Sequence, residues 1–149
     1  MVCEASAIPA FDREAGEDWL SHILTVPYEW IIEREGHCIG VARLTLTESD
    51  NRARYAVALF DSALYGKGLG TETTRLVLQF AFQELKLHRV DLNVLTYNHR
   101  AIACYKKCGF REEGVDREDA WIEGQWASDM RMGILEDEWR RMHETKHIL

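Results

Sequence analysis

The stretch LYGKGLGTET, residues 64–73, decides how this chain folds around its centre. It places glycine at positions 66, 68 and 70 and runs directly into a helix-forming segment. Each glycine loses backbone entropy on folding and supplies no side chain to pack. Such a loop is useful where a ligand must approach bare backbone, and the free N–H groups at a helix start favour an anion. The stretch therefore predicts a strand, a loop and a helix that together bind a phosphate.

Segments that favour strands precede the loop. They are residues 28–35, 38–46 and 53–60, and polar or glycine-containing turns separate them. Their short connections predict an antiparallel meander. Further upstream, residues 11–24 have the apolar spacing of a short amphipathic helix that ends before Pro27.

A second group of elements follows the loop. Residues 71–86 are expected to form a helix on which Leu76, Phe80 and Leu87 recur at helical spacing. The predicted fold class is mixed α/β, of the α+β-like kind: a central, mostly antiparallel sheet with a βαβ unit at its centre. The remaining elements are, in order, a strand over 88–96, a helix over 98–108 closed by Gly109, strands around 110–116 and 126–134, and a charged C-terminal helix.

The composition is typical of one soluble domain. The 149 residues are 46% hydrophobic and 29% charged, and we expect a single domain over 1–149 with its core at 28–135 and a terminal helix at 136–147. No apolar run approaches the roughly 20 residues of a membrane span, so no membrane partner is expected. The net charge of −7 argues against nucleic-acid binding and favours cationic or amine partners. The four cysteines form no CxxC pair, which predicts free thiols and a cytoplasmic location.

Two nucleotide-binding patterns compete with a ligand-free turn as explanations of the glycine loop. The Walker A pattern is absent, because Lys67 comes too early and no lysine precedes Thr71. The Rossmann pattern GxGxxG also fails, since the third glycine stands at 70 and position 71 is threonine. Asp91 does lie about twenty residues further on, where that pattern wants an acidic residue.

A second group of candidate residues lies on the helix over 98–108. Asn98, Ala101 and Tyr105 are spaced three and four apart, so they share one helix face. A polar end, a small residue and a phenol along one stripe suit a long ligand lying against the helix. A tyrosine on such a face is also a common core residue, so the stripe alone does not establish a site.

Two patterns of metal-ligating residues need weighing. His143, Glu144 and His147 spell HExxH, in which two histidines hold zinc and the glutamate acts as base. Here the motif lies at the end of a charged helix, and we expect a solvated helix face. Cys104 and Cys108 are one helical turn apart, and we expect them to be small buried thiols. The sequence therefore predicts no metal site.

The glycine loop, the βαβ unit and the helix over 98–108 together resemble the GNAT superfamily of N-acetyltransferases. That family's acetyl-CoA loop reads Gln/Arg-x-x-Gly-x-Gly/Ala, and YGKGLG at 65–70 occupies its place. The similarity covers roughly residues 28–140, and the segment at 111–135 is similar to the RimJ/RimL-type subgroup, which acetylates ribosomal-protein N-termini and related amines. The family's next pattern, N-x-x-A-x-x-x-Y-x-K-x-G-F, is matched by Asn98, Ala101, Tyr105, Lys107, Gly109 and Phe110.

The resemblance implies an acetyl-CoA-dependent enzyme in which a primary amine attacks the thioester directly in a ternary complex. It assigns a backbone N–H near Leu59 to the developing oxyanion and the Tyr105 phenol to the departing thiolate. No general base is singled out, and Asp61, Glu33 and Glu35 are candidates by strand position. The residues that the resemblance assigns to acetyl-CoA are Leu59, Phe60, Tyr65, Gly66, Lys67, Gly68, Leu69, Gly70, Thr71, Asn98 and Ala101.

Two departures from the family pattern change these expectations. Tyr65 replaces the usual glutamine or arginine, which alters a side-chain contact to the pyrophosphate while leaving the backbone donors. The family's customary first strand is missing, which predicts a sheet edge covered by the N-terminal segment or by a second subunit in a homodimer. The acceptor stays open between a protein N-terminus, a polyamine, an amino sugar and an antibiotic. The alternative function is a non-catalytic CoA-binding sensor or interaction module.

Overall fold

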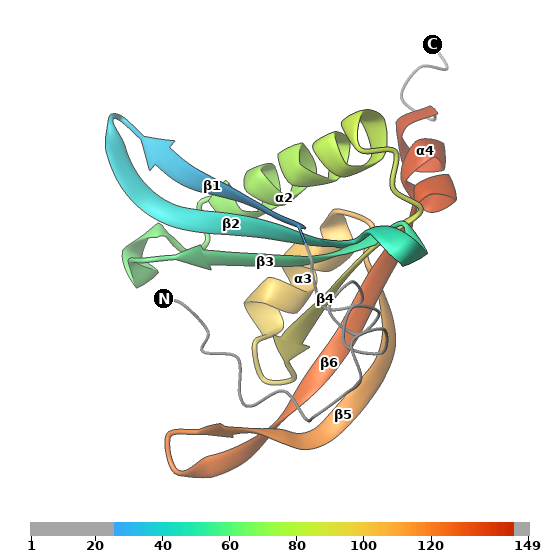
Figure 1. Cartoon of the computed structure of the whole chain (residues 1–149). Coiled ribbons are helices and arrows are strands. Elements are labelled where there is room, and N and C mark those ends of the chain that lie inside the picture. Colours follow the sequence, from blue (N-terminus) through green and yellow to red (C-terminus); the bar gives the residue numbers. More distant parts are fainter. Residues whose placement is uncertain (1–25, 145–149) are drawn as a thin grey trace, which may run out of the picture.

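The computed structural model describes residues 26–144, and in this range the strands form one mixed sheet (Figure 1). The strands are β1 Val26–Arg34, β2 His37–Thr47, β3 Arg52–Leu59, β4 Arg89–Leu95, β5 Arg111–Ile122 and β6 Gln125–Leu135. The helices are α2 Leu69–Gln79, α3 His99–Lys107 and α4 Glu136–Glu144, with short turns η1 Glu48–Asp50 and η2 Ser62–Leu64 and a π-helical segment η3 Phe80–Glu84. The six strands follow the order β1-β2-β3-β4-β6-β5, and all neighbours except β3 and β4 are antiparallel. The predicted fold class is confirmed.

The first three strands form the predicted antiparallel meander. Glu35 and Gly36 join β1 to β2 with φ angles of 52° and 77°, and a two-residue hairpin turn of this hand needs positive φ at both positions. Alternate residues of β2, among them Ala42 and Leu44, are fully buried in the core. β1 is an edge strand within the described residues, and the helix predicted over 11–24 lies outside them.

The helix after the glycine loop differs from its prediction at both ends. It begins at Leu69, two residues earlier than expected, and after Gln79 it continues as the π-helical η3. The buried face of α2 runs through Thr74, Val77 and Leu78. Leu76, predicted to be part of the apolar face, is 62% exposed, so that prediction is wrong. A residue two positions from Thr74 and Leu78 points to the opposite side of a helix with 3.6 residues per turn.

The βαβ unit is confirmed, but its two parallel strands touch only briefly. β3 and β4 pair through Arg52–Arg54 and Arg89–Asp91. Beyond this point β3 continues to Leu59 beside β2, whereas β4 continues to Leu95 beside β6. The sheet therefore opens between the C-terminal halves of β3 and β4, directly ahead of the glycine loop and of α3.

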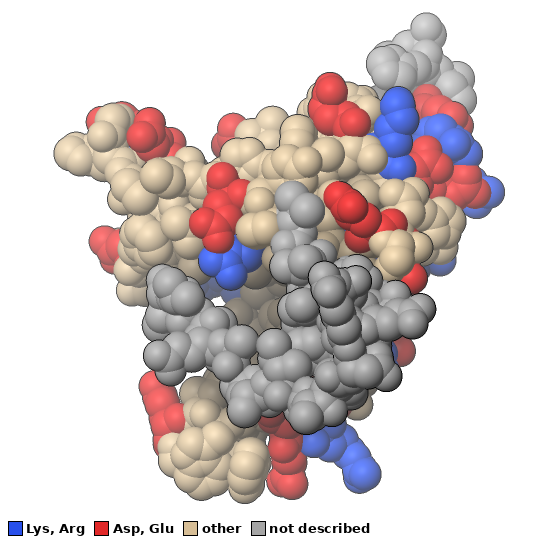
Figure 2. Space-filling view, in the orientation of Figure 1, with Lys and Arg blue, Asp and Glu red and all other residues tan. Residues whose placement is uncertain are grey.

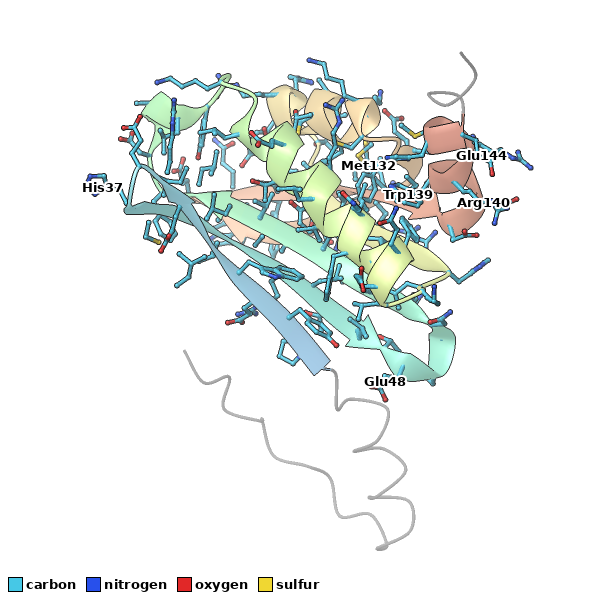
Figure 3. The ribbon with its side chains drawn as sticks, turned by 90° about the horizontal axis from the view of Figure 1, so that it is seen from above. His37, Glu48, Met132, Trp139, Arg140 and Glu144 are labelled. Carbon is cyan, nitrogen blue, oxygen red and sulfur yellow. The ribbon has the colours of Figure 1, made fainter. Side chains whose placement is uncertain are left out.

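The β5–β6 hairpin and α4 form where they were predicted, but the hairpin is longer than expected. β5 extends to Ile122 rather than to about 116, so the β5–β6 hairpin forms a long arm (Figure 1), with Trp121 and Trp126 in edge contact near its tip. α4 covers the far end of the core, where the Trp139 ring packs at a tilt against Phe82 with ring centroids 5.4 Å apart. Figure 3 shows Arg140 and Glu144 on the side of α4 away from Met132 and the core. The expected residues 145–147 of this helix lie outside the described range.

Ion pairs join β3, β4 and β5 on the face of the sheet opposite the hydrophobic core. Asp91 is buried, and its carboxylate accepts from Arg54 Nε at 2.8 Å and Arg89 Nε at 3.3 Å. Arg89 also pairs with Glu113, which raises the pKa of the guanidinium and lowers the pKa of the carboxyl. Asp91 is thus held by two arginines, which removes it as the ribose-binding acid of a Rossmann site.

The surface charge fits the composition. In the view of Figure 2, carboxylate side chains are scattered over the described surface, and side chains of both signs gather over α4. Arg140 accounts for part of that group, since it pairs with Glu136, Asp137 and Glu144 on its own helix. No helix between residues 26 and 144 is long and apolar enough to cross a membrane.

Candidate functional site

The glycine loop presents bare backbone at the start of α2. Gly66 and Gly68 both have φ of 79°, a conformation that favours glycine, and no atom lies within 4 Å of where their Cβ atoms would be. Gly68 is the N-cap of α2 and no side chain caps the helix, so the N–H groups of its first turn keep their capacity for a ligand. Gly70 lies inside the helix, and a Cβ there would make ordinary contact with Cys104 Sγ at 3.8 Å. This geometry suits the predicted phosphate.

The opening in the sheet presents a second backbone donor. The Phe60 N–H donates to the Ile39 carbonyl of β2 at 2.9 Å. Because N–H groups alternate in direction along an antiparallel strand, the Leu59 N–H points to the other edge of β3. That is the edge from which β4 has separated, since the pairing with β4 stops at Arg54. The Leu59 N–H therefore faces the opening, as its predicted role requires.

Tyr105 lies beside the same opening. Its ring packs edge-on against Tyr55 at 6.4 Å and Phe110 at 5.8 Å, and Tyr55 is the first residue of β3 beyond the segment paired with β4. Among residues 26–144 the Tyr105 hydroxyl has no hydrogen-bond partner, although the ring is half-buried. Burial first, and then the nearby thiols of Cys104 and Cys108, raise the pKa of Tyr105 to about 12. The phenol is thus protonated at neutral pH and available as a donor.

Asn98 has a structural role that the spacing did not indicate. It is the N-cap of α3, and its Oδ1 accepts a hydrogen bond from the Ala101 N–H at 3.2 Å. Ala101 and Tyr105 are half-buried against the core, whereas Asn98 is exposed. The predicted stripe exists, and part of the Asn98 hydrogen-bonding capacity serves the helix start.

Several side chains around the loop were missed by the sequence reasoning. Thr74 donates to the Gly70 carbonyl at 2.7 Å and receives a hydrogen bond from the Tyr55 hydroxyl at 3.0 Å, so β3 is tied to the start of α2. The Arg100 guanidinium lies 5.2 Å from the centre of the Tyr65 ring, which places a cation beside the loop position where the family has glutamine or arginine. No motif marks the Tyr55–Thr74 and Tyr65–Arg100 contacts, because each joins residues more than 15 positions apart.

The thiols of α3 lie directly under the first turn of α2. Cys104 Sγ is 3.2 Å from Thr71 Oγ1, and the Cys108 thiol donates to the Thr71 carbonyl at 3.7 Å. A hydrogen bond from Cys108, followed by Thr71 and the charges of Lys107 and Arg75, lowers the pKa of Cys104 to about 6 against opposing burial. The pKa of Cys108 is raised by the same hydrogen bond. Cys104 is therefore the more acidic of the two thiols.

The lowered pKa predicts that Cys104 is a reactive thiol at neutral pH. We expect its alkylation by iodoacetamide to follow a titration with a midpoint near pH 6, compared with about 8.5 for an ordinary cysteine. Peptide mass spectrometry of protein quenched at a series of pH values measures this, with Cys104→Ser as the variant that must lose the signal. A midpoint near that of an ordinary thiol would contradict the lowered pKa of Cys104.

The three candidate general bases lie at the ends of strands or in the turns beside them. Asp61 caps η2 by accepting the Ala63 N–H at 2.9 Å, and Glu33 and Glu35 are exposed beside the β1–β2 turn. None of these contacts identifies a base, so that assignment stays a prediction.

His143 Nδ1 lies 2.9 Å from the Trp139 carbonyl, while His147 of the HExxH motif is outside the described residues. Within the described range no three His, Cys, Asp or Glu residues form a group that could hold a metal.

Comparison with known proteins finds relatives that are acetyltransferases. The family model of the acetyltransferase (GNAT) domain matches residues 4–111. The "Probable N-acetyltransferase YjcK" of Bacillus subtilis (strain 168) is 36% identical over 105 residues, which cover 60% of this chain and 58% of that protein. The spermidine N(1)-acetyltransferase of Escherichia coli (strain K12) is 29% identical over 117 residues, which cover 78% and 62%. The chain thus spans about three fifths of the length of these curated relatives.

Solved structures share the same fold. A mutant of spermidine N-acetyltransferase SpeG from Vibrio cholerae superposes with a TM-score of 0.73 at 27% identity, covering 87% of this chain and 78% of that one. The Vibrio cholerae enzyme in complex with CoA and spermine gives a TM-score of 0.72 at 25% identity, with coverage of 90% and 81%. The family match spans most of the chain, and the glycine loop and the opened sheet agree with it. The chain belongs to the GNAT family of acetyltransferases.

Proposed function

We propose that this chain is an acetyl-CoA-dependent N-acetyltransferase that transfers the acetyl group to a primary amine. The observation that carries the proposal is the meeting of three donors around one opening: the first turn of α2, the Leu59 N–H and the Tyr105 hydroxyl. The first suits the diphosphate of CoA, and the other two suit the thioester. The Vibrio cholerae relative described in complex with CoA supports the choice of donor substrate.

The proposed reaction needs three events in a ternary complex. The unprotonated amine forms a bond to the thioester carbonyl carbon, and the carbonyl oxygen gains negative charge that the Leu59 N–H stabilises. The C–S bond then breaks, and the sulfur leaves with the electron pair. With a pKa of about 12, Tyr105 is a weak acid, so it acts first as a hydrogen-bond donor to the thiolate. The amine releases its extra proton to solvent or to a base.

For the acceptor we propose a small cationic amine of the polyamine kind. The spermidine acetyltransferases among the relatives support it, as does the net charge of −7. The alternative is a protein N-terminus, the substrate of the RimJ/RimL-type subgroup, and a Bacillus subtilis relative named for ribosomal acetylation is 28% identical over 105 residues. A homodimer and a cytoplasmic location stay predictions.

A thiol-release assay with acetyl-CoA tests the function. We expect CoA release with spermidine and spermine above that with N-terminal peptides, and a KM for the polyamine that rises with salt because screening weakens the attraction between opposite charges. A KM that does not change with salt, or turnover of anionic amines only, would argue against a cationic acceptor. Calorimetric binding of CoA without release for any amine would instead favour the non-catalytic sensor.

A further inference from the structure

The arm of the β5–β6 hairpin, residues 115–129, carries an apolar strip that is open to solvent. In the strand pairing Trp121 lies opposite Trp126, and Val115 lies opposite Met130. Met130 packs against the hydrophobic core, and Trp126, four residues before it on β6, lies on the same face of the sheet. That face continues onto the arm, which projects beyond the core (Figure 1). There Trp121 is 61% exposed and Trp126 is 58% exposed.

The two tryptophans form a surface whose shape is fixed by the hairpin. Their ring centroids lie 4.9 Å apart with the ring planes at 73°, so the edge of one ring meets the face of the other. Glu123 and Gly124 form the turn beyond them with φ angles of 49° and 78°, which suits a tight two-residue hairpin. Exposed apolar patches mark interaction sites, and tryptophan is enriched among the residues that contribute most to protein binding.

Carboxylates dominate the rest of the arm. It contains five acidic side chains and one basic side chain, Arg117. Asp116 and Asp129 lie directly opposite each other in the strand pairing, where like charges destabilise a sheet. Asp116 is offset by an ion pair with Arg131. The acidic side chains of the arm that form no ion pair within residues 26–144 are Glu118, Asp119, Glu123 and Asp129.

Edge protection is the simpler explanation of these charges. β5 is an edge strand of the described sheet, and its pairing with β6 is irregular between Asp116 and Ala120. Charged side chains and bulges on an edge strand prevent it from pairing with other chains. This explanation accounts for the carboxylates but not for two exposed tryptophans, because protection of an edge favours fewer apolar side chains.

Charge determines which partner fits the arm. A second copy of the chain carries a net charge of −7, and residues 1–25 of the same chain contain five acidic residues and one arginine, so both are repelled. A lysine or arginine side chain instead gains a carboxylate and the face of an exposed tryptophan. The strip is open and runs from Met130 to the turn, roughly 17 Å along β6. An extended polypeptide suits such a surface, whereas a small molecule needs an enclosed pocket.

We infer that the arm is a docking surface for a segment of a partner protein that is rich in lysine and arginine. The tryptophan pair receives cationic side chains on its ring faces, and the unpaired carboxylates supply the opposite charge. The inference is independent of the proposed function, because none of the residues of the arm was assigned to acetyl-CoA or to acetyl transfer.

Fluorescence anisotropy of the full chain with a short fluorescein-labelled oligoarginine peptide tests this inference. We expect the wild type to bind the peptide with an affinity that falls with salt. The double variant Trp121→Ala/Trp126→Ala should weaken binding by at least about tenfold. The triple variant Glu118→Gln/Asp119→Asn/Glu123→Gln should weaken it similarly and reduce its salt dependence. All five side chains are exposed, so melting temperatures should stay close to wild type.

Matched changes outside the arm separate docking from general attraction to an acidic protein. Ile31→Ala removes an apolar side chain that is 66% exposed on β1, and Glu33→Gln/Glu48→Gln/Glu84→Gln removes three exposed carboxylates. Neither variant should change the peptide affinity by more than about twofold. Equal losses in the two triple variants would reduce the binding to net charge and overturn the inference.

Four other results would also overturn the docking surface. They are no binding of the peptide by the wild type, full affinity in the tryptophan double variant, displacement of the peptide by an equal concentration of spermine, and self-association through the tryptophans. Displacement by spermine would assign the arm to small polycations. Sedimentation of the wild type beside the tryptophan double variant detects self-association, since a wild-type dimer that the double variant lacks would assign the arm to a second copy.

Discussion

Tyr105→Phe is expected to lower kcat by about 10²–10³-fold, because it removes the hydrogen-bond donor that we propose for the departing thiolate. The Tyr105 hydroxyl has no partner within the described residues, so its loss breaks no hydrogen bond of the fold. The ring keeps its edge contacts with Tyr55 and Phe110. Stability and CoA affinity should therefore stay close to wild type, while kcat and kcat/KM fall together. Steady-state kinetics beside thermal melts measure both effects.

Two other tyrosines supply matched controls for this variant. Tyr28→Phe makes the same chemical change on β1, where the ring packs against Trp30 and Phe80, and should leave kcat unchanged. Tyr55→Phe removes the hydrogen bond to Thr74 and should lower the free energy of unfolding by about 1 kcal/mol. A fully active Tyr105→Phe protein would show that Tyr105 only packs against the core and would remove it from the mechanism.

Gly68→Val is expected to abolish CoA binding, with a loss of at least about 100-fold in affinity. Gly68 is the N-cap of α2 with φ of 79°, and the side chain added there would occupy the space through which a phosphate approaches the backbone. The same φ also strains a valine, by roughly 1–2 kcal/mol. The melting temperature should therefore drop by a few degrees while the circular dichroism spectrum stays native. Calorimetric titration with CoA measures the affinity.

Gly36→Val separates strain from the loss of the site. Gly36 has φ of 77° and, like Gly68, no atom within 4 Å of its Cβ position, but it lies in the β1–β2 turn. The two variants should lose similar stability, and only Gly68→Val should lose CoA affinity. Equal affinity in the two variants would show that the phosphate binds away from this loop.

The local structure of the site could be predicted from the sequence because it depends on residues that are close together in the chain. Positive φ at Gly66 and Gly68 and the helix that follows them are properties of ten consecutive residues. The strands before the loop and the helix that carries Tyr105 followed in the same way from periodicity and turn residues. Both family patterns that named the site are likewise short and continuous. Within the described residues, the strands and helices were predicted at positions that the structure confirms or moves by a few residues.

Other features depend on contacts between distant segments, and the sequence could not supply them. The apolar face of α2 was predicted through Leu76, but packing on the sheet selected Thr74, Val77 and Leu78 and left Leu76 exposed. The arginine beside the loop comes from position 100, across a whole strand and helix from Tyr65. The spacing of Asp91 from the glycine loop matched that of a ribose ligand, but in the structure its carboxylate forms ion pairs with Arg54 and Arg89.

The sequence by itself determined that this chain has a glycine loop at a helix start that suits a phosphate, since backbone conformation at glycine and the free N–H groups of a helix are local. It determined equally that a tyrosine follows on a later helix. The tertiary structure alone decided that β3 and β4 separate after three paired residues, which turns the Leu59 N–H and Tyr105 toward one opening. It also decided that Arg75 and Lys107, from two different helices, line one groove. The reason is physical: strand pairing and helix packing choose among many registers that satisfy the same local pattern, and only the sum of the long-range contacts selects one.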